Sequence, residues 1–184
     1  MPLTLANLKP VREIIASANL IVGNDGSTTA NNSSIGLSTD EDRLRFQQLR
    51  SRSDLILIGG NTARRDPYKR TLIPLYILTH AKVRLQPKNQ LAKQFSMSIT
   101  ELFSEISNNF PLTEATSPIN LLVEAGPALL KQMIELSLID HLYLTKNLEK
   151  NGENKISIEE LTRSFKLVTS ERVGACEFMH YQKL

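Results

Sequence analysis

Acidic residues and glycines follow three apolar runs of the sequence, and their types and positions could support chemistry. The three segments are Asn24-Asp25-Gly26, Gly59-Gly60 and Glu124-Ala125-Gly126. A glycine turn that leads into a helix lets backbone N–H groups approach a phosphate, and the helix N-terminus adds a favourable dipole. A carboxylate at the same place could bind a ribose or a base donor, or could assist proton transfer. Each segment could equally be an ordinary turn in which the acid caps a helix or bonds nearby backbone.

Cationic residues cluster shortly after the second segment. The cluster runs from Arg64 to Arg70 and contains three arginines, one lysine and Asp66. Guanidinium groups beside the end of a strand could bind a phosphorylated substrate through paired hydrogen bonds. A solvated surface loop is the alternative interpretation of the same residues.

Several other kinds of site are not indicated. The three histidines, at positions 80, 141 and 180, form no metal-binding motif, and Ser33, Ser34 and Ser38 have no nucleophile motif around them. The glycine segments match neither the Rossmann nor the Walker spacing. We therefore expect a bound cofactor to carry the chemistry, with the protein orienting its ligands.

Composition limits the possible partners and the cellular location of the protein. A formal net charge of +3 without a stacking platform for bases argues against nucleic acid as a partner. The apolar runs are too short for a membrane helix, and the first ten residues show no signal peptide. Cys176 is the only cysteine, which excludes an internal disulfide. These features predict a cytoplasmic protein that contacts no membrane.

The elements that must position these residues follow from the apolar patterns. Strands are predicted at 20–22, 55–58, 75–80, 119–123 and 141–145, and two more around Val173-Gly174. Helices are predicted at 39–52, where Ser38 and Glu41 form a capping box, around 99–106, and from Ala128. Residues 27–36 read as a polar loop. The alternation predicts one α/β domain over residues 1–184, with a mostly parallel sheet, an antiparallel C-terminal edge, and the three segments on one rim.

Two stretches resemble a known family. They are "ANLIVGNDGSTTANNSSIGLSTDEDRLRFQQLRSRSDLILIGGNTARRDPY" (18–68) and "LLVEAGPALLKQMIELSLIDHLYL" (121–144). Together they resemble the pyrimidine reductase domain of riboflavin biosynthesis, within the dihydrofolate-reductase-like superfamily. The resemblance implies a three-layer α/β/α fold and a homodimer. It also implies NADPH as hydride donor and 5-amino-6-(5-phosphoribosylamino)uracil as the phosphorylated substrate.

The resemblance also assigns residues to the two ligands. On the cofactor side it places Gly59, Gly60, Thr62, Thr79, Gly126, Pro127, Ala128 and Leu129. On the substrate side it places Asp25, Ser34, Arg64, Asp66 and Glu124. Of these, Asp25 and Glu124 are the carboxylates that could assist proton transfer.

Three departures from the family pattern keep alternatives open. Ala125 stands in place of the first glycine of the family's double glycine, Gly23-Asn24 precedes the Asp-Gly turn, and His141 follows Asp140. One alternative is a dihydrofolate-reductase-like enzyme for another pterin or pyrimidine, although the absence of tryptophan argues against dihydrofolate reductase itself. The other is a non-catalytic nucleotide-binding relative. The deaminase zinc motif is missing, so only the reductase activity is expected.

Overall fold

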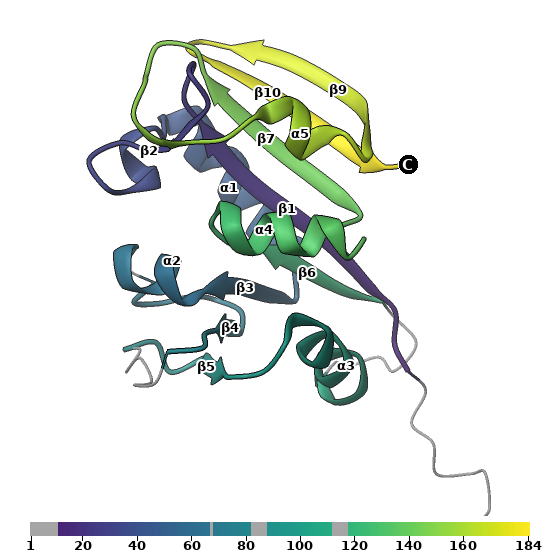
Figure 1. Cartoon of the computed structure of the whole chain (residues 1–184). Coiled ribbons are helices and arrows are strands. Elements are labelled where there is room, and N and C mark those ends of the chain that lie inside the picture. The colour runs from purple at the N-terminus through teal and green to yellow at the C-terminus, as the bar shows by residue number, and fades with distance from the viewer. Residues whose placement is uncertain (1–10, 67, 82–87, 112–117) are drawn as a thin grey trace, which may run out of the picture.

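An eight-stranded sheet forms the centre of the molecule (Figure 1). The computed structural model describes residues 11–66, 68–81, 88–111 and 118–184. The first ten residues, in which no signal peptide is predicted, lie outside this part. The sheet has the order β5-β4-β3-β6-β1-β7-β10-β9. Its strands are β1 (Ile14–Val22), β3 (Leu55–Gly59), β4 (Leu75–Leu78), β5 (Ala92–Phe95), β6 (Ile119–Val123), β7 (His141–Asn147), β9 (Phe165–Val173) and β10 (Cys176–Lys183).

Five α-helices, a short 3-10 helix (Ser34–Gly36) and a small second sheet complete the described elements. The helices are α1 (Asp40–Ser51), α2 (Gly60–Arg65), α3 (Ile99–Asn109), α4 (Pro127–Glu135) and α5 (Ile158–Thr162). Strands β2 (Ser27–Thr29) and β8 (Glu153–Lys155) pair antiparallel as a separate two-stranded sheet. No helix in the described part of the chain is both long and apolar enough to cross a membrane.

The strand directions confirm the predicted fold class. Every pairing from β5 to β7 across the sheet is parallel. The last two strands, β10 and β9, are antiparallel to their neighbours and close the C-terminal edge. The molecule is therefore a three-layer α/β protein with a mostly parallel central sheet.

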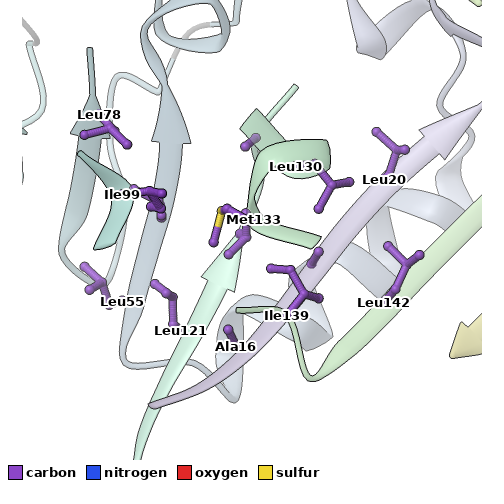
Figure 2. Packing of buried hydrophobic residues seen from close by; sticks show 14 of the residues in the cluster. Ala16, Leu20, Leu55, Leu78, Ile99, Leu121, Leu130, Met133, Ile139 and Leu142 are labelled. Atoms are coloured by element: carbon purple, nitrogen blue, oxygen red, sulfur yellow. The ribbon is translucent and has the colours of Figure 1, made fainter. Parts of the chain in front are cut away.

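Alternating apolar side chains attach a layer to each face of the sheet. In β3, Leu55 and Leu57 belong to the larger hydrophobic cluster, whereas Ile56 and Ile58 belong to a smaller one. The larger cluster includes side chains of α3, α4 and α5, and these helices lie on one side of the sheet with α1 behind it (Figure 1). Figure 2 shows Leu130 and Met133 of α4 over this face, near Leu20 and Leu121. Because both faces are covered, the central strands are almost continuously apolar.

Local differences from the sequence prediction have physical causes. The side chain of Thr39, not of Ser38, caps α1 by accepting from the Asp42 N–H, because the helix begins one residue later than predicted. The predicted polar loop at 27–36 contains β2, an Ala30–Ser33 bridge and a short 3-10 helix. Strand β5 was not predicted because its sequence, Ala-Lys-Gln-Phe, has no β-branched residue and forms an edge of the sheet.

Candidate functional site

A cavity of about 870 Å³ opens at the carboxyl ends of the parallel strands. This is the edge at which α/β sheets bind their ligands, and the volume is at the upper end of the range for small-molecule sites. Its wall is formed by β1, the loop after β2, α1, the junction of β3 with α2, the end of β4, and the start of α4. Because β4, β3, β6 and β1 are neighbours, the cavity extends across four strands.

Twelve of the thirteen site residues proposed from the sequence line this cavity. They are Ser34, Gly59, Gly60, Thr62, Arg64, Asp66, Thr79, Glu124, Gly126, Pro127, Ala128 and Leu129. The exception is Asp25, which is not among the lining residues. The segments that follow β3 and β6 thus meet at the cavity as expected, whereas Asp25, which follows β1, does not reach it.

The register of β1 explains the position of Asp25. Ala18 of β1 pairs with Val123, the last residue of β6, and β1 then continues beside β7 as far as Val22. The part of β1 that lines the cavity is therefore Asn19 to Ile21, in the second half of the strand. Asp25 instead forms an ion pair with Lys155 at 2.9 Å and accepts a hydrogen bond from the Ser27 N–H at 3.2 Å. The Lys155 contact, followed by Ser27, holds the pKa of Asp25 well below its ordinary value.

Glu124 is held by two residues that sequence reasoning did not select. Its side chain is 3% exposed, and Arg50 binds it with Nε at 2.7 Å from Oε1 and Nη2 at 2.7 Å from Oε2. The hydroxyl group of Tyr68 donates to Oε2 at 2.6 Å. A carboxylate buried at the end of an apolar strand needs such partners, so the sequence signalled that a partner exists without identifying it.

Aromatic rings also contact Arg50. The guanidinium carbon lies 4.2 Å from the ring centre of Phe46 and 5.2 Å from that of Tyr68. Burial, followed by the nearby charge of Glu124, raises the pKa of Tyr68 well above its ordinary value, so its hydroxyl remains a donor. Glu124, Arg50 and Tyr68 therefore form one rigid polar cluster in the cavity wall.

The starts of two helices form another part of the wall. Gly126 is the N-cap of α4 and Pro127 its first residue, and no side chain caps the helix. A Cβ atom on Gly126 would have Thr62 Oγ1, 3.7 Å away, as its nearest contact, so the chain is open here. Gly59 likewise precedes α2 without a side-chain cap. The uncapped first turn of α4 leaves backbone N–H groups available for an anion.

Comparison with known proteins identifies the family. The model of the RibD C-terminal domain matches residues 16–174. The chain belongs to this family. Among curated proteins, no sequence matches the chain.

Solved structures share the fold at low sequence identity. RibD of Acinetobacter baumannii superposes with a TM-score of 0.72 and 16% identity, over 94% of this chain and 58% of that one. The diaminohydroxyphosphoribosylaminopyrimidine deaminase/5-amino-6-(5-phosphoribosylamino)uracil reductase of Thermotoga maritima superposes with a TM-score of 0.69 and 11% identity, over 94% of this chain and 57% of that one. A pyrimidine reductase-like protein of Corynebacterium diphtheriae superposes with a TM-score of 0.67 and 17% identity, over 95% of this chain and 93% of that one. The chain thus spans a little over half of the first two proteins and nearly all of the third.

Ala125, which stands where the resemblance leads us to expect a glycine, is accommodated by the core. Ala125 is 4% exposed and belongs to the larger hydrophobic cluster. The glycine that follows it, Gly126, is the residue that caps α4 and faces the open side toward Thr62. The open backbone at the start of α4 therefore depends on Gly126.

The loop after β2 approaches α2 across the cavity of this RibD C-terminal domain. Ser33 Oγ donates to Asp66 Oδ1 at 2.8 Å, and Ser34 Oγ donates to Oδ2 at 3.5 Å. The turn before them contains Asn31 and Asn32 with φ of 55° and 63°, a left-handed conformation that asparagine tolerates better than most residues. Ser34 and Asp66, both predicted for the substrate side, are thus brought together.

Cationic side chains outnumber acidic ones around the cavity. Five arginines line it, at positions 43, 50, 64, 65 and 70, against the three carboxylates of Asp42, Asp66 and Glu124. Each of those carboxylates accepts a hydrogen bond from a side chain of the protein. Within the described ranges, no three His, Cys, Asp or Glu residues group as metal ligands would. The site therefore suits anionic ligands.

Proposed function

We propose that this protein is an NADPH-dependent reductase of 5-amino-6-(5-phosphoribosylamino)uracil or a related phosphoribosylamino-pyrimidine. The observation that carries the proposal is the single cavity in which the uncapped N-terminus of α4 lies within reach of an arginine-rich wall. Membership of the RibD C-terminal domain family supports it, as does the reductase activity named for the Thermotoga maritima relative.

The residues around α4 fit a dinucleotide. In the proposal, the first turn of α4, from Gly126 to Leu129, holds the pyrophosphate through backbone N–H groups that no side chain caps. Pro127 has no N–H, and it stands at the first helical position, where that group would have no partner in the helix. Thr62, beside Gly126, and Thr79, at the end of β4, add hydroxyl groups to the same wall. Gly59 and Gly60 have no side chains, so the backbone of the neighbouring turn can approach the ligand closely. When bound, the cofactor supplies a hydride to the substrate.

The substrate is proposed to lie toward α1 and the loop after β2. Ser34 and Asp66 supply polar contacts there, and Arg70 supplies charge for the ribose phosphate. Glu124 keeps Arg50 and Tyr68 in one orientation through three hydrogen bonds. The task of these residues is to hold the reacting carbon against the cofactor, since proximity and orientation supply much of the rate.

The carboxylate next to the ligands is Glu124 rather than Asp25. Asp25 is paired with Lys155 outside the cavity lining, so it has no described route to a bound substrate. Glu124 lines the cavity, and both its oxygens already accept hydrogen bonds. We therefore assign Glu124 as a positioning residue for the site and give Asp25 a structural role.

A homodimer is proposed as the working form. The outer side of β9 has no partner strand in the described part of the chain, and eight of its nine residues are exposed. Leu167, Val168 and Val173 add apolar surface along this edge. An exposed edge strand of this length is a template for pairing with another chain. Light scattering on the purified protein would give twice the chain mass; a monomer at micromolar concentration would contradict the proposal.

Cofactor and substrate are tested in one series. NADPH is first titrated into the protein while its fluorescence is followed, and then its oxidation is measured by absorbance with the uracil substrate present. Tight binding followed by oxidation is expected. Binding without oxidation would contradict the substrate and point to another pyrimidine or pterin. No binding would contradict the reductase proposal and favour a non-catalytic relative.

A further inference from the structure

Arg64 lies on the β4 side of the cavity, beside residues assigned to the cofactor. A Cβ atom built on Gly60 would be 2.5 Å from Thr79 Oγ1 and 3.2 Å from Arg64 Nη1. The guanidinium group therefore lies over Gly60, next to the hydroxyl group that ends β4. Its only side-chain partner within the described residues is Asn61 Oδ1, at 3.2 Å from Nη1. Arg64 thus presents an exposed cation with most of its N–H groups unused.

The order of the strands places this cation at one end of the cavity. Across the sheet come Thr79 after β4, Gly60 after β3, Gly126 after β6 and Asn19 in β1. The uncapped turn of α4, which follows β6, is in the middle. Arg50 of α1, which binds Glu124 after β6, and Ser33 of the loop after β2 contribute the rest of the wall, and Ser33 reaches Asp66 at the end of α2.

A dinucleotide whose pyrophosphate lies at the centre must extend toward both ends. Its nicotinamide has to meet the substrate, so its adenosine half points toward β4. NADPH differs from NADH only by a phosphate on the adenosine ribose. We propose that Arg64 binds this 2′-phosphate and sets the preference of the protein for NADPH over NADH. The inference rests on the proposed function and adds to it the residue that distinguishes the two cofactors.

The chemistry of the guanidinium group suits this task. Its N–H groups are arranged to bind two phosphate oxygens at once, and a dianionic phosphate strengthens both hydrogen bonds. NADH offers no phosphate there, so losing Arg64 would leave its affinity nearly unchanged. Because Arg64 is exposed, the contact would weaken as salt rises. This placement replaces the expectation from the sequence that Arg64 binds the phosphate of the substrate.

Binding measurements test the inference without turnover. Calorimetry would compare NADP⁺ with NAD⁺, and 2′,5′-ADP with 5′-AMP, on the wild-type protein and on Arg64→Ala, Arg64→Lys and Arg65→Ala. Arg65 is the matched control because it is also exposed, lines the cavity on the same helix, and does not lie at Gly60. Unfolding midpoints would show that each variant is folded.

We expect Arg64→Ala to weaken NADP⁺ and 2′,5′-ADP about tenfold, and NAD⁺ and 5′-AMP less than about twofold. Arg64→Lys should recover part of the loss, and Arg65→Ala should leave the preference between the two dinucleotides unchanged. An unchanged preference in Arg64→Ala, an equal loss for both dinucleotides, or the same loss of preference in Arg65→Ala would overturn the inference while the reductase proposal stands. Failure of the wild-type protein to bind either dinucleotide would overturn both.

Discussion

The polar cluster around Glu124 shows how one residue can organise the wall of a cavity. The carboxylate accepts from Arg50 and Tyr68 on two separate segments, and the aromatic ring of Phe46 covers the guanidinium group. Removing one partner from such a cluster leaves buried polar atoms without their hydrogen bonds. The stability of the fold and the shape of the site are therefore linked at this position.

Tyr68→Phe tests this link. The change removes the 2.6 Å hydrogen bond to Glu124 and keeps the ring over Arg50, so we expect the free energy of unfolding to fall by about 1–2 kcal/mol. Urea denaturation would measure it. Tyr143→Phe is the control, because no hydrogen bond of the Tyr143 hydroxyl is found within the described residues. Equal losses in the two variants would show that the contact with Glu124 contributes nothing.

Asp25 gives a prediction about acid stability. Its contacts with Lys155 and Ser27 hold its pKa in the folded state below the ordinary value of 3.8. A lowered pKa contributes stability above the ordinary value, and that contribution is lost as the pH falls through the folded pKa. The unfolding temperature of the wild-type protein should therefore drop more steeply below about pH 4 than that of Asp25→Asn. Parallel profiles would contradict the assigned ion pair.

At the scale of elements, the junction of β3 with α2 is a tightly packed part of the cavity wall. Gly60 sits against Thr79 at the end of β4, and Arg64 passes over it. Sequence patterns predicted the strand before Gly59 and Gly60 and placed these glycines at the ligand-binding rim of the sheet. They did not predict α2, because the segment after Gly60 read as a loop. The resemblance placed Arg64 on the substrate side, and in the structure its guanidinium group lies near Gly60 and Thr79.

Gly60→Ala should strain this junction. The new Cβ would lie 2.5 Å from Thr79 Oγ1 and 2.9 Å from Thr79 Cβ, so β4 or α2 has to move. We expect a loss of about 1–3 kcal/mol in unfolding free energy, measured by chemical denaturation. Gly126→Ala is the matched control, since its Cβ would have 3.7 Å of space to Thr62. A greater loss in Gly126→Ala than in Gly60→Ala would contradict this account.

Strand register marks the limit of what the element patterns could show. The end of β1 at Val22 was predicted correctly, and Asp25 was therefore placed on the shared rim. Pairing with β7 carries β1 past the end of β6, which moves Asp25 away from Glu124. Register depends on which residues face each other across strands that are distant in sequence. A single strand pattern contains no signal for it.

At the scale of the whole molecule, the strands of the sheet differ in how far they are buried from solvent. The strands β3 and β6 are almost fully buried, whereas β9 is exposed along eight of its nine residues. We expect the amides of β9 to exchange with solvent deuterium faster than those of β6 at low protein concentration. Hydrogen-exchange mass spectrometry would compare peptides from the two strands. Protection of β9 that grows with protein concentration would support the proposed dimer, and equal exchange in β6 would contradict the uneven protection.

The overall architecture was predictable because alternating strands and helices admit few arrangements. Short apolar runs joined by glycine turns required a mostly parallel sheet with ligands at one edge. The partners of Glu124 were not predictable in the same way. Arg50 is 74 residues from Glu124 along the chain, and the sequence placed it in the predicted helix at 39–52 without indicating a partner. Such pairs become visible only when the layers are assembled.

Arg50, Glu124 and Tyr68 come from three separate segments yet form one ion pair and three hydrogen bonds. A lineage that lost the acid would keep a partly buried cation with no counter-charge, and one that lost the arginine would keep a buried anion. Neither single change is easily tolerated, so drift at these positions is coupled. Across the descendants of a common ancestor, these three residues should be retained together or replaced together, and their joint inheritance would trace the history of the site.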